Sequence, residues 1–201
     1  MAASIQATGR APAAPEVIAA TDKSVDACLA IARAMDETDL RKHLEEAGSR
    51  IGTRGLLVRV VAPLLHPPGR PWCDGTIAAG HEHFAVTGVR DFLGGLAGAM
   101  GNLERAPLLV TAIPSGHLHE LGALLVSALT ANLGWRTVRL GASVPVTELA
   151  GAARELKSRA LALSVVQPED DRDLPREWER LRAPMPPEVS FIFGGAAAPA
   201  Y

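Results

Sequence analysis

Apolar and polar positions alternate in a regular way along the second half of the chain. From Leu103 onward, short apolar runs recur, and each is followed by a longer segment whose apolar residues are three and four apart. The short runs predict strands buried on both faces, and the longer spacing predicts helices. We therefore expect βα units that build a parallel sheet with helices on both faces. The predicted strands are 108–113, 136–140, 160–166 and 189–193, and the predicted helices are 120–133, 147–156 and 174–181.

The first half of the chain has helical periodicity instead. In the first segment, residues such as Val25, Cys28 and Met35 recur at helical spacing, which is typical of an amphipathic helix. Asp39 is the predicted N-cap of a second helix that ends at Gly48, and two adjacent prolines end the third. Four helices joined by short loops predict a bundle. Their predicted ranges begin near residue 15 and then cover 39–47, 52–65 and 76–99.

These two patterns predict two domains. Residues 1–15 are rich in Ala and Pro without a period, which predicts a disordered tail. Residues 16–102 form the expected four-helix bundle, and residues 103–201 form the expected Rossmann-like, flavodoxin-type α/β domain. A chain of 201 residues, 48% of them hydrophobic, is long enough for two small cores.

Composition excludes several classes of function. The net charge is -2 and no cluster of Lys and Arg occurs, so we expect no direct binding to nucleic acid. The two cysteines, Cys28 and Cys73, lie in different regions and imply no disulfide framework, which favours a reducing cytoplasm. No apolar run is long enough to cross a membrane, and no signal peptide begins the chain.

Candidate chemistry lies in the loop 115–122, between the first predicted strand and its helix. Parallel sheets bind ligands at the carboxyl ends of their strands, which is where this loop falls. The loop carries His117 and His119, and imidazole is a common metal ligand. Taken alone, two histidines in a loop are more often ordinary polar loop residues. Gly116 belongs to the same loop, and the acidic segment 169–173 is interpreted as solvated.

Three short motifs extend this picture. His119 and Gly122 are followed at long intervals by Ser164, Val166 and the pair Gly194-Gly195. Their spacing resembles the cobalamin signature Asp-x-His-x-x-Gly, Ser-x-Leu and Gly-Gly of corrinoid proteins. The resemblance implies that His119 coordinates cobalt from below. It also implies that the nucleotide tail of the cofactor enters a slot beside the serine and the glycine pair.

Two positions depart from that signature. His117 stands where the family has an aspartate, so the carboxylate that orients the lower ligand is missing; a neutral imidazole can still accept the N–H of His119. Val166 replaces the leucine, a conservative apolar change. The loop 141–145 resembles the family's loop that touches the edge of the corrin.

The helical half adds a second resemblance. Trp72 followed by Glu82-His83 resembles the Trp-x9-Glu-His pattern of the CarH-type cobalamin photoreceptors, in which these residues cover the upper face of the corrin. Read from the sequence alone, Trp72 caps the bundle and Glu82-His83 are solvated. In the family, a histidine directly after the tryptophan becomes the upper ligand in the light; here that residue is Cys73. The candidates for the upper cobalt ligand in the light are His83 first and then His81, with water or the thiolate of Cys73 as further alternatives. The plainer interpretation is that Cys73 only packs against its neighbours.

The resemblance implies a light sensor rather than an enzyme, with adenosylcobalamin as cofactor and no catalytic residue. Photolysis of the upper bond would shift the helices and change binding to an oligomer or an unidentified protein partner. We expect a stand-alone form without the DNA-binding domain of CarH-type proteins, like the photocobilins, which bind biliverdin as a second chromophore. We also expect the last βα unit that most relatives carry to be absent. The alternatives are a corrinoid methyl carrier of a methyltransferase system and a cobalamin-responsive antirepressor.

Overall fold

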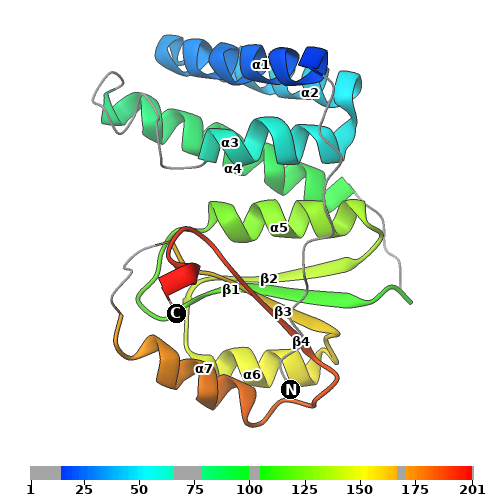
Figure 1. Cartoon of the computed structure of the whole chain (residues 1–201), viewed down its shortest axis with the longest axis vertical. Coiled ribbons are helices and arrows are strands. Elements are labelled where there is room, and N and C mark those ends of the chain that lie inside the picture. Colours follow the sequence, from blue (N-terminus) through cyan, green and yellow to red (C-terminus); the bar gives the residue numbers. More distant parts are fainter. Residues whose placement is uncertain (1–14, 66–77, 100–104, 167–170, 201) are drawn as a thin grey trace.

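The structure is a computed structural model that describes residues 15–65, 78–99, 105–166 and 171–200, with side chains from residue 23 except at 97–99. Three layers are visible in Figure 1: N-terminal helices, a sheet with helix α5 above it, and helices α6 and α7 below it. The helices are α1 (Pro15–Ala34), α2 (Glu37–Leu56), η1 (Leu57–Val61), α3 (Ala62–Leu65), α4 (Ala79–Ala99), α5 (Leu121–Asn132), α6 (Val146–Glu155), α7 (Leu174–Arg182) and η2 (Ala198–Ala200). The strands are β1 (Leu108–Pro114), β2 (Arg136–Val144), β3 (Ala160–Ser164) and β4 (Ser190–Gly194).

The four described strands form one parallel sheet in the order β2-β1-β3-β4. Alternate residues of the central strands face opposite layers. Leu109 and Ala162 pack with Val126 of α5, whereas Val110 and Leu161 pack with α6 and α7. The predicted parallel sheet with helices on both faces is therefore confirmed. From β1, the strand order continues to one side with β2 and to the other side with β3, and parallel sheets bind ligands at such a switch point.

Three strands differ in length from their predictions, β1 only by the added Pro114. β2 continues to Val144 instead of ending at Leu140, and its pairing with β1 shifts register twice near its end. Gly141 and Ser143 both have positive φ there, so the extra residues follow a bulged path. β3 ends at Ser164, two residues before the predicted end.

Helix α2 begins and bends at other residues than predicted. It begins at Glu37, and its N-cap is Asp36 and not Asp39: the carboxylate of Asp36 accepts the N–H of Asp39 at 2.9 Å. The helix continues through Gly48, which is therefore not its C-cap. Gly48 packs against Leu56 instead: a Cβ there would lie 3.2 Å from Leu56 Cδ2. The chain bends instead at Gly52, whose φ of 74° and ψ of 158° are non-helical.

A π-helical turn, η1, joins α2 to α3. Pro63 follows it by two residues and has no N–H to donate to Arg59, while its ring would collide with that carbonyl in an α-helix. The wider turn avoids the collision, and the N–H of Ala62 bonds to Leu57 five residues earlier. Leu57, Val60 and Val61 of this turn are fully buried.

The largest core lies among the N-terminal helices and extends into α5. Leu40, Leu44 and Leu93 belong to it together with Leu124 and Ala128 of α5. The helical layer and the α/β layer therefore share α5 as a common wall. A separate four-helix bundle, and a domain boundary at residue 102, stay predictions.

Within the described ranges, no helix combines the length and apolar character needed to span a bilayer.

Candidate functional site

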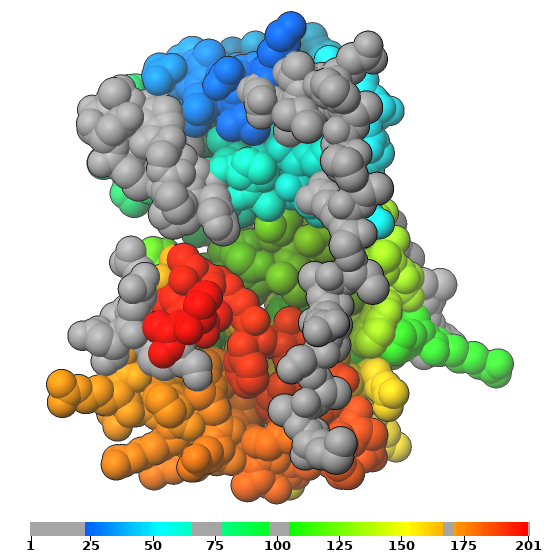
Figure 2. Space-filling view, viewed as in Figure 1, coloured from blue at the N-terminus to red at the C-terminus, as the bar shows by residue number. Residues whose placement is uncertain are grey.

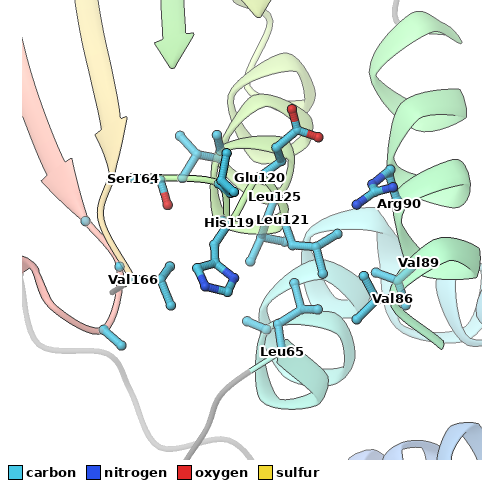
Figure 3. Close-up of a pocket in the computed structure, with 18 of the residues that line it drawn as sticks. Leu65, Val86, Val89, Arg90, His119, Glu120, Leu121, Leu125, Ser164 and Val166 are labelled. Carbon is cyan, nitrogen blue, oxygen red and sulfur yellow. The ribbon is translucent and has the colours of Figure 1, made fainter. Parts of the chain in front are cut away.

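A cavity of about 670 Å³ lies between the helical layer and the carboxyl edge of the sheet. Its walls come from α3 and α4 on one side, the loop after β1 and the start of α5 in the middle, and the ends of β3 and β4 on the other. Figure 3 shows side chains from these elements converging on one space. In Figure 2 the red C-terminal residues lie beside the green atoms of α5 at this level. The cavity thus occupies the expected ligand site of the sheet.

His119 enters the cavity from the loop after β1. Its imidazole points into the open space in Figure 3, and the residue is solvent-accessible in the absence of a ligand. Apolar side chains of Leu65, Val86 and Leu125 line the cavity around it. No described residue forms a hydrogen bond with this imidazole, so a ring nitrogen is available to a metal. Within the part of the chain that is described, no cluster of three or more His, Cys, Asp or Glu forms a metal site of protein ligands alone.

Ser164 lies at the end of β3 with its hydroxyl buried and without a hydrogen-bond partner among the described residues. It lines the cavity and is 6% exposed. Gly122, in the first turn of α5, lies against it: a Cβ on Gly122 would be 2.6 Å from Ser164 Oγ. The glycine therefore keeps a narrow space open beside a hydroxyl that lacks a partner, and such a buried group is costly unless something bonds it.

Gly194 and Gly195 line the same end of the cavity, where β4 turns. Gly195 has a φ of +106°, and a Cβ there would overlap the carbonyl oxygen of Val165. The turn is fixed by two bonds: Val165 N–H donates to Gly194, and Ala197 N–H donates to Val165. Only glycine fits at position 195. Because it has no side chain, its own backbone lines the cavity. Val166, which follows Val165, also lines it.

His117 has a different position from His119. It is 2% exposed and does not line the cavity; its Nε2 lies 3.3 Å from Asp171 Oδ2. A hydrogen bond between His117 and His119 is not among those found in the described residues, so the expected acceptor role is not seen. The interpretation of segment 169–173 as solvated is wrong for Asp171, which bonds His117 and the start of α7. Gly116 is exposed with φ of +79° and donates its N–H to Ser143 Oγ at 3.1 Å.

The helical side of the cavity contains one of the predicted upper residues. Glu82, in the first turn of α4, lines the cavity, whereas His83 is exposed and does not. Trp72 and Cys73 lie outside the described residues. Arg90, Val86 and Glu82 follow each other at four-residue spacing and all line the cavity, so helical periodicity could have identified Arg90. Glu120, beside His119, lines it as well and was not predicted.

The fold and the site together define a class: a Rossmann-like parallel α/β layer with a helical layer over its ligand-binding edge. The monomethylamine corrinoid protein of Methanosarcina barkeri has a similar structure, with a TM-score of 0.66 and 18% identity, over 88% of this chain and 86% of that one. This likeness shows a shared fold.

Two transcriptional repressors are similar in sequence. The chain is 30% identical over 179 residues to the HTH-type transcriptional repressor CarH of Myxococcus xanthus, covering 86% of this chain and 58% of the repressor. It is 27% identical over 168 residues to the HTH-type transcriptional repressor CarA of the same organism, covering 82% and 55%. The chain thus spans somewhat more than half the length of these relatives. No family model matches it.

Proposed function

We propose that this protein binds cobalamin in the cavity between its helices and its sheet, with His119 as the lower ligand of cobalt. One observation carries the proposal: the accessible imidazole of His119, in the loop after β1, and the buried hydroxyl of Ser164, at the end of the adjacent β3 and without a partner among the described residues, line the same cavity. The similarity to CarH and CarA and the fold shared with a corrinoid protein support it.

The residues present fit a corrinoid with its tail displaced. The hydroxyl of Ser164 needs a bonding partner, and a polar nucleotide tail would supply one. Gly122 leaves the space beside that hydroxyl open, and Gly195 lets the chain turn tightly at the same end. Apolar side chains of α3 and α4 would cover the opposite face of the ring. When bound, the cofactor would supply a light-sensitive cobalt–carbon bond.

The finer proposal is that the bound form is adenosylcobalamin and that the protein is a light sensor without enzymatic activity. Glu82 would contact the upper group, since it lines the helical side of the cavity. His83 is exposed on the next position of α4 and would need a rotation or shift of that helix to reach the cavity. Loss of the upper group in light would favour that shift, because it removes contacts that hold the helix in its dark position.

The experiment is reconstitution of the purified chain with adenosylcobalamin in the dark, followed by absorption spectra before and after illumination. We expect a retained pigment with a spectrum distinct from that of free cofactor, and a change in the light. His119→Ala should abolish the distinct dark spectrum, while the matched change His83→Ala should leave it intact and alter only the light spectrum. Retention of an identical spectrum by His119→Ala would refute the lower ligand.

Two further parts of the proposal concern output and a second pigment. A change of oligomer or of binding to a protein partner would carry the signal, and gel filtration in dark and light would detect the former. Biliverdin would bind as a second chromophore, and an absorption band in the red after its addition would test this. An unchanged elution volume would rule out the change of oligomer and leave partner binding as the output, and the absence of bound bilin would rule out the second chromophore.

A further inference from the structure

His117 is a fully buried polar side chain that the proposed function does not use. Its side chain is 1% exposed, and its Nε2 contacts Asp171 Oδ2 at 3.3 Å, across a sequence separation of 54 residues. Burial of a polar ring is unfavourable unless it is bonded, so this contact fixes which way the ring lies. The other ring nitrogen, Nδ1, is buried without a partner among the described residues.

Asp171 is itself held in place by the start of α7. Its Oδ1 accepts the backbone N–H groups of Asp173 at 2.9 Å and Leu174 at 3.3 Å, while Oδ2 faces His117. Leu174 is 1% exposed and belongs to a core cluster, so the helix end that positions the carboxylate is anchored in the protein interior. The two oxygens of one carboxylate therefore join α7 to the loop after β1.

The backbone of His117 makes two more connections. Its N–H donates to Pro114 at 3.1 Å, and its carbonyl accepts the N–H of Ser143 at 3.1 Å. The hydroxyl of Ser143 accepts the N–H of Gly116 at 3.1 Å. His117 thus connects the loop after β1 to the end of β2 through Ser143 and to the segment before α7 through Asp171.

We propose that Asp171 is a positioning residue for His119, acting through the buried ring of His117. The inference rests on the proposed function, in which His119 is the cobalt ligand. Only Leu118 separates the two histidines, and its side chain is 72% exposed and offers little packing. The position of His119 therefore depends on the bonds of His117 before it and on α5 after it. Partners that orient a ligating residue typically change metal affinity by about 10 to 100-fold.

The test compares Asp171→Ala with Asp173→Ala, which removes the same charge from the same segment. Asp173 is the residue before α7 and its side chain makes no capping bond. Amide hydrogen exchange of the apoprotein is the first readout. Asp171→Ala should accelerate exchange in residues 115–120 as well as at the start of α7, and Asp173→Ala should change neither strongly. His117→Ala keeps the capping bonds of Asp171, so it should accelerate exchange in 115–120 and spare α7.

The second readout is cobalamin binding and the spectrum of the bound cofactor. We expect Asp171→Ala and His117→Ala to weaken binding about 10-fold and to shift the spectrum toward that of a cofactor without the protein ligand. Asp171→Asn keeps a polar side chain of the same shape, which can cap α7 and bond the ring, so it should restore both readouts to near the native level. The double variant Asp171→Ala/His117→Ala should bind cobalamin no more weakly than the weaker of the two single variants, because each single change already removes the contact between the two side chains.

Each outcome decides one question. If the native protein binds cobalamin through His119 but Asp171→Ala matches Asp173→Ala, the positioning role is wrong and the proposed function stands. If the native protein binds no cobalamin, the proposed function fails. Amide exchange of the apoprotein then still tests whether Asp171 positions the loop through His117. Unchanged exchange in 115–120 for both Asp171→Ala and His117→Ala would overturn that role.

Discussion

Gly195→Ala should destabilise the protein far more than the same change at the adjacent Gly194. At Gly195, φ is +106° and an added Cβ would overlap the carbonyl oxygen of Val165, with the carbonyl carbon at 2.7 Å and the nitrogen at 2.9 Å. These are backbone atoms, so no side-chain rotation can relieve the contact. At Gly194 nothing lies within 4 Å of the Cβ position. The two variants therefore add the same methyl group at neighbouring positions, and only the one at 195 should destabilise the protein strongly.

The magnitude follows from two contributions. Holding an alanine in a sparsely populated backbone conformation costs about 1–3 kcal/mol. The overlap also displaces the Val165 carbonyl, which accepts the N–H of Ala197 at 3.1 Å, and a lost backbone bond costs about 0.5–1.5 kcal/mol. Their sum is about 1.5–4.5 kcal/mol. At about 2–4 °C per kcal/mol for a chain of this size, Tm should fall by about 3–18 °C.

Thermal unfolding followed by circular dichroism measures both variants against the native apoprotein. Gly194→Ala should lie within about 2 °C of the native Tm, since Gly194 is half-buried with open space at its Cβ position and a change without steric conflict usually costs under about 0.5 kcal/mol. Equal Tm values for the two variants would refute the conclusion that position 195 requires glycine. The result does not depend on a cofactor, so it tests the geometry of this end of the cavity directly.

Three other changes test separate parts of the structure. Asp36→Ala removes the N-cap of α2 and should cost about 1 kcal/mol in urea unfolding, whereas Asp39→Ala keeps the backbone N–H that the cap bonds and should cost less. Leu161→Ala, at a fully buried position of β3, should cost about 2–5 kcal/mol by the same measurement. Burial raises the pKa of Cys28 from 9.0 to about 12. The unfolded thiol ionises near pH 9 and the folded one does not, so the unfolding free energy should decline from pH 9 toward pH 12, and Cys28→Ala should flatten that decline.

Periodicity identified the α/β layer well because its strands are continuous apolar runs. β1, for example, is buried at all seven positions, and its predicted start at residue 108 agrees with the structure. The loop with His119 could be placed at the carboxyl edge for the same reason, since a parallel sheet puts every βα loop there. Strand ends were less accurate: β2 continues through two residues with positive φ, which apolar periodicity does not indicate.

The remaining differences arise from contacts between distant segments. Gly48 reads as a helix end, yet its lack of a side chain serves packing against Leu56, and tertiary contact overrides local preference. Asp171 reads as one member of an acidic loop, since nothing local indicates that it meets His117 from 54 residues away. Helical spacing from Glu82 does indicate Arg90, but only once the face of α4 toward the cavity is known.

Helix α5 explains how one exposed histidine can have a defined position. It is apolar on all sides, which is typical of a helix buried between two layers. Leu124 and Ala128 pack into the core of the N-terminal helices, and on another side Val126 packs against β1 and β3. Ser127 adds a buried hydrogen bond of 3.0 Å to Thr111 of β1. Because α5 begins two residues after His119, the packing of both layers fixes the C-terminal end of the loop, as His117 fixes its other end.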